Sequence, residues 1–173
     1  MEALAGPVVV MSVLLALAGA MKVAQPASTM GALRAMRLPS SPGVVRVLGV
    51  VEIVVAAAAG ITFERPLLAL LAAMYLAFAA FVAAALGANT PLQSCGCFGR
   101  ADTPPSTVHL GLNLTAACVA LVAAATSTPS LTDTLSDQPW SGIPFAFLVA
   151  VSVYLCVTLL TVLPLTMRSS RIT

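Results

Sequence analysis

Five long apolar segments occupy most of this 173-residue chain, and only short polar stretches separate them. A helix needs about 20 apolar residues to cross the hydrocarbon core of a bilayer. Charged residues make up 8% of the chain, whereas soluble domains carry roughly 25%. The segments are Leu4–Met21, Gly43–Ile61, Pro66–Leu86, Thr107–Ala125 and Ile143–Met167. We therefore predict an all-α membrane protein with five transmembrane helices and no soluble domain.

The first segment ends in a sequence similar to a signal-peptide cleavage site, with Ala18 and Ala20 at the usual spacing. A signal peptide also begins with a basic region. This chain begins MEALAGP, which contains Glu2 and no Lys or Arg. We therefore expect the first segment to be a retained transmembrane helix.

Lys and Arg are distributed unequally between the two membrane sides that five spans define. One side receives only Arg65. The other receives Lys22, Arg34, Arg37, Arg46, Arg100, Arg168 and Arg171. Cytoplasmic loops are enriched in Lys and Arg. The distribution therefore predicts that the N-terminus lies outside and the C-terminus in the cytoplasm, and it places the loop between the third and fourth segments on the cytoplasmic side.

The stretch between the first two segments contains an amphipathic pattern. Met30, Leu33 and Met36 recur at helical spacing, and Arg34 and Arg37 alternate with them. This pattern is typical of a short helix that lies at the membrane surface. On the opposite side of the membrane, the slightly acidic segment 127–142 ends near Trp140, and Trp is enriched at membrane interfaces. We therefore expect both stretches to contact the interface.

Glu52 lies inside the second apolar segment, where a carboxylate is costly and by default marks a functional site with a partner. Its neighbours on the same helix face are small: Gly49, Ala56, Ala59 and Gly60. Arg46 falls on another face, whereas Lys22 ends the first segment on the same membrane side and has a flexible stem that can reach inward. We predict that Glu52 faces the bundle interior and pairs with Lys22. A purely structural pair, or a protonated and hydrogen-bonded Glu52, is the alternative to a functional role.

Two of the four cysteines, Cys95 and Cys97, stand one residue apart in the polar stretch QSCGCFGRADTPPS. Nearby cations favour the thiolate, which is the nucleophilic and metal-binding form, and Arg100 follows the pair. Gly96 permits the unusual torsions that a disulfide in so short a ring needs. Such a disulfide is expected to be strained and easily reduced. The alternative is a tight turn with two incidental thiols.

His109 is the only histidine, and it begins the fourth apolar segment with Asn113 one turn further along the same face. Imidazole exchanges protons near neutral pH. A lone histidine near a membrane interface is nevertheless more often a solvated polar end than a catalyst, and we expect that here. Cys118 and Cys156 lie within apolar segments, where we expect buried, unreactive thiols.

Three motifs resemble the MauE-like branch of the DoxX-type membrane proteins. They are LALAGAMK at the end of the first segment, GVVEIVVAAAAG in the second, and SCGCFG between the third and fourth. The resemblance covers roughly residues 10–125. It implies a four-helix membrane domain over residues 1–126. A polar segment, 127–142, and an additional transmembrane helix with a short basic tail, 143–173, then follow.

The resemblance also implies a redox role. Members of this family are associated with redox processes, including maturation of a disulfide-rich periplasmic dehydrogenase subunit alongside a thioredoxin-like partner. By resemblance, Cys95 and Cys97 form the redox pair, while Lys22 and Glu52 are the family's membrane charges. These two charges and His109 would tune the thiols or support the fold. The implied partners are the lipid bilayer and a thioredoxin-like or other membrane protein.

Three functions follow from these patterns. The first is thiol–disulfide or electron transfer that supports maturation or oxidation of a partner. The second is a non-enzymatic accessory subunit of a larger membrane complex, such as a transporter, so whether the chain is an enzyme stays open. The third is a soft-metal site formed by Cys95, Cys97 and His109, although three ligands are fewer than a closed zinc site needs. No P-loop, HExxH or GxSxG pattern occurs, and we expect no cofactor and no nucleic-acid partner.

Overall fold

The computed structural model describes residues 4–87, 105–126 and 129–169, and these ranges contain helices and no strand. The helices are α1 (Ala5–Ala24), α2 (Pro26–Ala35), α3 (Pro42–Thr62), α4 (Arg65–Gly87), α5 (Thr107–Ala125), α6 (Leu131–Ser136) and α7 (Ile143–Ser169), with a short 3₁₀ helix at Pro139–Gly142. Five of them, α1, α3, α4, α5 and α7, are long and apolar enough to cross a membrane. The predicted all-α membrane class and its five spans are confirmed.

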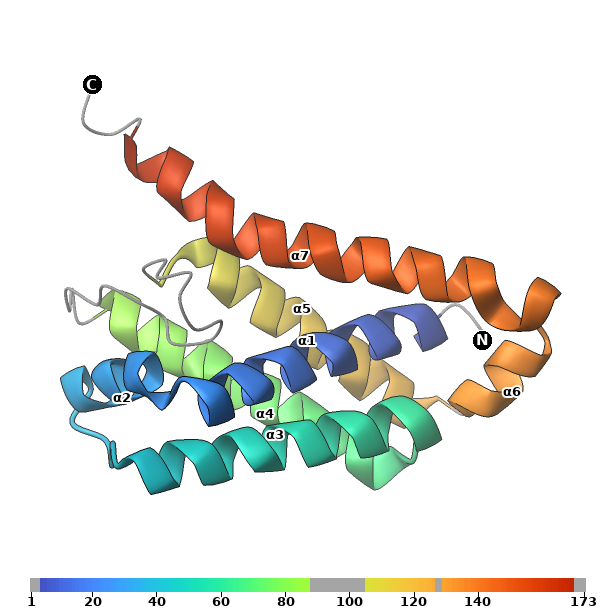
Figure 1. Cartoon of the computed structure of the whole chain (residues 1–173), viewed down its shortest axis with the longest axis horizontal. Coiled ribbons are helices and arrows are strands. Elements are labelled where there is room, and N and C mark those ends of the chain that lie inside the picture. The colour runs from blue at the N-terminus through green and yellow to red at the C-terminus, as the bar shows by residue number, and fades with distance from the viewer. Residues whose placement is uncertain (1–3, 88–104, 127–128, 170–173) are drawn as a thin grey trace.

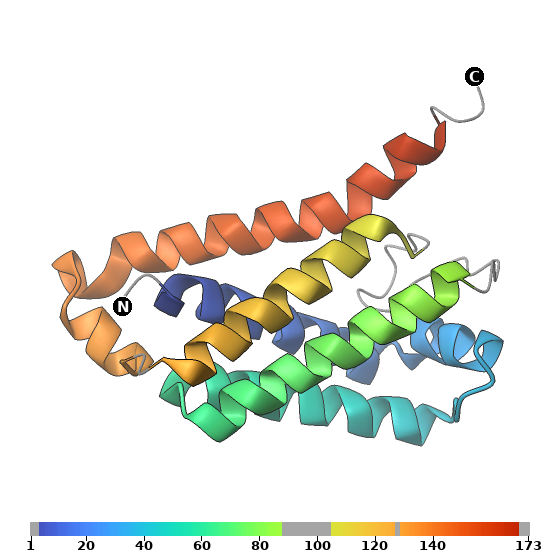
Figure 2. The ribbon, with the colours of Figure 1, turned by 180° about the vertical axis from the view of Figure 1, so that it is seen from behind.

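Four of the long helices form a bundle, and the fifth lies along its outside. The pairs α1–α3 and α4–α5 make the most extensive contacts, and α3–α4 and α1–α5 close the bundle. Helix α7 runs beside α1 and also touches α5 (Figures 1 and 2). Helix α2 lies at the end of the bundle where α1 ends and α3 begins, while α6 lies at the opposite end (Figure 1). The predicted short helix between the first two spans is therefore present as α2, and its position at the membrane surface stays a prediction.

The core of the bundle is built mainly from small side chains. Alanines of α3 and α5, such as Ala59 and Ala116, are fully buried, and larger residues such as Leu15, Leu68 and Leu71 fill the space between the helices. Lipid tails are as apolar as these side chains, so moving a side chain from lipid into the protein core gains little free energy. Close packing holds the helices together instead. Small residues make this packing possible because they let backbones approach closely.

Helices α1 and α3 meet at a pair of glycines. A Cβ atom built on Gly19 would lie 2.5 Å from the carbonyl oxygen of Gly49, and one built on Gly49 would lie 2.6 Å from that of Gly19. Neither position has room for a side chain without moving a backbone. Nearer the other end of the same pair, Gly60 lies against Ser12, whose Cβ would be 2.8 Å from an added methyl group. Glycines thus set the distance between α1 and α3.

Residues 127–142 are polar, as the sequence indicated, but they also contain local structure. Ser130 and Asp133 form a reciprocal capping box at the start of α6. The 3₁₀ helix follows, and Trp140 is 80% exposed within it. This exposure agrees with the expected contact between Trp140 and the membrane interface.

We expect Gly19→Ala to lower the free energy of unfolding by about 1–3 kcal/mol, which is the usual range for overpacking. The matched control is Gly111→Ala in α5, where an added Cβ meets nothing within 4 Å. This control is expected to be neutral or slightly stabilising because Ala is the better helix former. Chemical denaturation in detergent measures both. Equal tolerance of the two changes would show that the glycine crossing does not set the helix spacing.

Candidate functional site

The interior of the bundle contains one ion pair within the described residues. Lys22 Nζ donates a hydrogen bond to Glu52 Oε2 at 2.8 Å, and the two side chains are 4% and 0% exposed. Lys22 lies in the last turn of α1 and Glu52 in the middle of α3. The predicted pairing of these residues across two helices is confirmed. Burial makes each charge dependent on the other, because an unpaired ion in such an environment is strongly destabilising.

The glycine crossing is what brings these two charges together. Gly19 and Gly49 each stand three residues before a charged residue, one helical turn away. A Cβ on Gly19 would lie 3.0 Å from Glu52 Cβ, and a Cβ on Gly49 would lie 3.0 Å from Lys22 Cβ. Each glycine therefore makes room for the charged side chain of the facing helix. The same residues that set the helix spacing also define the geometry of the ion pair.

Aromatic side chains from α4 complete the surroundings of Lys22. Its Nζ lies 5.1 Å from the centroid of the Phe78 ring, within the range of a cation–π interaction. Tyr75 meets Phe78 edge to face, with ring centroids 6.4 Å apart. The Tyr75 hydroxyl donates a hydrogen bond of 2.6 Å to the carbonyl oxygen of Met11. Phe78 thus packs over the cation, while Tyr75, one turn earlier on α4, contacts the Phe78 ring and bonds to α1.

A small cavity of about 30 Å³ lies next to Lys22. Its polar lining comes from Lys22, Tyr75, His109 and Asn113, and its apolar lining includes Phe78. A cavity of this size is large enough to hold a water molecule. Four polar side chains from three helices therefore converge on a site inside an otherwise apolar bundle. We call Lys22, Glu52, Tyr75, His109 and Asn113 the interior polar site.

His109 is buried, so the expectation of a solvated polar end was wrong. Its side chain is 3% exposed, and Ser106 Oγ lies 2.9 Å from His109 Nδ1. Asn113, 9% exposed, donates a hydrogen bond of 2.7 Å to the carbonyl oxygen of His109. The inward face of α5 carries both residues, as their spacing predicted, and Leu160 of α7 lines the same cavity. Sequence reasoning missed the burial of His109 because the sequence does not show how the other helices, including α7, lie against α5.

The structure describes two of the four cysteines, Cys118 and Cys156. Cys95 and Cys97, the candidate redox pair, lie outside the described residues. Cys118 is a free thiol and exposed on the outer face of α5, so the expectation of a buried side chain was wrong for it. That face points away from the bundle because the small residues of α5 take the inner one. Cys156 is also free and partly buried.

The described residues contain no group of three or more His, Cys, Asp or Glu side chains that could hold a metal ion. The soft-metal interpretation would need Cys95 and Cys97 in addition to His109. Sequence reasoning also missed Tyr75 and Phe78. Their spacing of three residues on an alanine-rich helix is a signal of a shared face, but it does not say which face points inward.

We expect Lys22→Met to destabilise the protein by about 3–5 kcal/mol, because it leaves the buried Glu52 carboxylate without a counter-ion. Glu52→Gln should be less damaging, since the amide oxygen can still accept a hydrogen bond from Lys22. The double change Lys22→Met with Glu52→Leu should recover part of the loss, because no charge then remains buried.

Denaturation in detergent provides the measurement, and Arg46→Met, a change of the same type at an exposed position of α3, provides the control. Exposed substitutions usually change stability by less than about 0.5 kcal/mol. Equal losses for Lys22→Met and Arg46→Met would rule out a stabilising role for the buried pair.

Comparison with known proteins supplies a family for this architecture. The family model described as "Methylamine utilisation protein MauE" matches residues 2–128. No curated protein and no solved structure matches the chain. The matched region includes the whole interior polar site and the four helices of the bundle. The wider grouping with DoxX-type proteins stays a prediction, but the match covers well over half of the sequence, and the chain belongs to the MauE family.

Proposed function

We propose that this protein is a membrane accessory protein of methylamine utilisation that exchanges disulfides with a partner through Cys95 and Cys97. The family description names the process, and the Cys-Gly-Cys motif supplies the chemistry. The partner class is a thioredoxin-like or other membrane protein with its own cysteine pair. The proposed outcome is maturation or oxidation of that partner.

The observation that carries this proposal is the position of the interior polar site. Residues 88–104, which contain both cysteines, connect the end of α4 to the start of α5. His109 lies in the first turn of α5 and Lys22 in the last turn of α1. An imidazole that can exchange protons and a rigidly held ion pair therefore lie in the same end of the bundle as the attachment points of the cysteine segment.

The proposed exchange conserves electrons and protons. The thiolate of one cysteine attacks a disulfide of the partner and forms a mixed disulfide, and one partner sulfur leaves as a thiolate. The second cysteine then attacks the mixed disulfide and releases the other partner sulfur. Two electrons and two protons pass to the partner, and Cys95 and Cys97 become a disulfide. In the reverse direction, the Cys95–Cys97 disulfide oxidises a partner dithiol.

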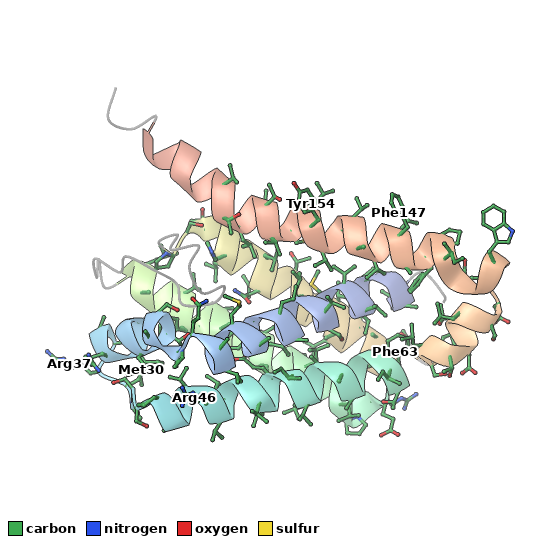
Figure 3. The ribbon with its side chains drawn as sticks, viewed as in Figure 1. Met30, Arg37, Arg46, Phe63, Phe147 and Tyr154 are labelled. Atoms are coloured by element: carbon green, nitrogen blue, oxygen red, sulfur yellow. The ribbon has the colours of Figure 1, made fainter. Side chains whose placement is uncertain are left out.

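A second candidate function is supported by the surface of α7. Phe147 and Tyr154 are 66% and 69% exposed and project from the bundle (Figure 3). A long apolar helix with little cover from its own chain suits docking to another membrane subunit. The protein would then stabilise a larger complex without redox chemistry.

We expect Cys95→Ser and Cys97→Ser each to abolish disulfide exchange, because a dithiol couple needs both sulfur atoms. Cys118→Ser is the matched control, since its thiol lies on the outer face of a transmembrane helix, and it should leave exchange intact. A maleimide gel-shift assay in graded redox buffers measures the oxidation state. If Cys95 and Cys97 never change oxidation state while partner binding is retained in the Ser variants, the accessory role replaces the redox role.

We further propose that the end of the molecule bearing α2 faces the cytoplasm. A membrane-impermeant maleimide applied to intact cells should then leave Cys95 and Cys97 unlabelled and react only after permeabilisation. The control is Asp137→Cys in the Cys95→Ser and Cys97→Ser background, because Asp137 is exposed at the opposite end and should be labelled from outside. The reverse pattern would invert the orientation.

A further inference from the structure

The end of α2 has an unusual backbone. The amide N–H of Leu38 donates to the carbonyl of Leu33 at 2.9 Å, and that of Arg37 donates to the carbonyl of Arg34 at 3.0 Å. These two bonds define a Schellman motif, in which the residue after the C-cap adopts a left-handed conformation and is usually glycine. Here that residue is Arg37, with a φ of 56°. The chain thus places a long cation where glycine fits best.

The strain at Arg37 is not offset by packing. Phe63 has a similar φ of 53° at the end of α3, but its ring is 4% exposed and contributes to the core. Arg37 is exposed and lies at the outer tip of the molecule (Figure 3). An unfavourable conformation that persists without packing is a reason to look for a function of the side chain. The packing of the described residues does not account for an arginine at this position, so the guanidinium group is the feature that needs an explanation.

Two further arginines are exposed at the same end. Arg34 lies in the last turn of α2, and Arg46 lies in the first turns of α3, which packs against α2. The C-terminal end of the α2 dipole favours a cation at Arg34 and at Arg37, the residue directly after the C-cap, but this effect does not explain Arg46. Among the described residues, the acidic side chains other than the buried and paired Glu52 lie at the opposite end of the bundle: Glu64, Asp133 and Asp137. The described residues therefore supply no exposed carboxylate at this end of the bundle.

The arginines lie next to exposed apolar surface. Helix α2 is too short to cross a membrane, and its Thr29 and Ala32 are buried against the bundle, while Met30 is half-buried. Beside it, Val44 and Val47 of α3 are 47% and 65% exposed and begin the apolar surface of a transmembrane helix. A basic patch directly next to such a surface can bind a phosphate group while the acyl chains follow the helix.

We propose that Arg34, Arg37 and Arg46 form a basic surface that binds the headgroup phosphates of anionic phospholipids. Guanidinium groups bind phosphate through paired N–H donors. The site holds α2 at the membrane surface and is independent of the cysteine chemistry. Among the described residues, Trp140 is the other exposed side chain with a positive φ, and it lies at the opposite end of the molecule. Each end thus has one exposed residue in a left-handed conformation whose side chain is suited to the membrane interface.

The test uses the purified full-length protein in detergent with added phosphatidylglycerol or phosphatidylcholine, and native mass spectrometry to count retained lipids. The wild type should retain phosphatidylglycerol preferentially. Arg37→Gly should weaken this binding about fivefold, which corresponds to about 1 kcal/mol per arginine near a membrane surface. Combining Arg37→Gly with Arg34→Gln and Arg46→Gln should remove the preference.

Arg37→Gly also separates lipid binding from folding. Glycine suits the left-handed position, so the thermal stability of this variant should equal or exceed that of the wild type. Arg65→Gln, which removes a cation at the opposite end, is the charge-matched control and should bind lipid normally. The proposal is overturned if Arg37→Gly retains full phosphatidylglycerol binding, if it loses stability along with binding, or if Arg65→Gln weakens binding equally.

Discussion

The close approach of α1 and α3 at Gly19 and Gly49 is the constraint on which the interior of this protein depends. Because both residues lack a side chain, the backbones come near enough for Lys22 and Glu52 to meet at 2.8 Å with almost no exposure. A wider spacing would leave each charge unpaired in a medium that cannot solvate it. The glycines and the ion pair therefore require each other, and the remaining polar groups assemble around the side chain of Lys22.

Much of this arrangement could be predicted from the sequence. The five spans follow from apolar length alone, and the Lys22–Glu52 pair follows from helical spacing, since a buried carboxylate needs a cation and only small residues share its face. The burial of His109 could not be predicted. It depends on how the helices pack around α5, and Leu160 of α7, about 50 residues further along the chain, lines the same cavity. The sequence does not specify where α7 lies. The outward direction of Cys118 was missed for a similar reason: on an apolar helix, hydropathy alone does not distinguish the face toward lipid from the face toward protein.

The two ends of the molecule differ in chemistry, and this difference connects the fold to its proposed functions. One end carries Arg34, Arg37 and Arg46 on its surface and the interior polar site just beneath. The other carries the capped α6 and the exposed Trp140. A basic surface fixes α2 at the headgroup level, and α2 in turn packs against α3, the helix that bears Glu52. Contact with lipid and the position of the buried pair are thereby linked through one short helix.

This link has a consequence for the cysteine segment. A thiol pair that exchanges disulfides must be accessible to a partner, yet its base must stay fixed so that both sulfur atoms reach the same bond in turn. The helices on either side of the segment supply the fixed base, since Phe78 of α4 packs over Lys22 and Tyr75 of α4 bonds to α1, while α5 and α4 pack extensively against each other. In the proposed mechanism, the bundle provides the rigid part and the cysteine segment carries out the exchange.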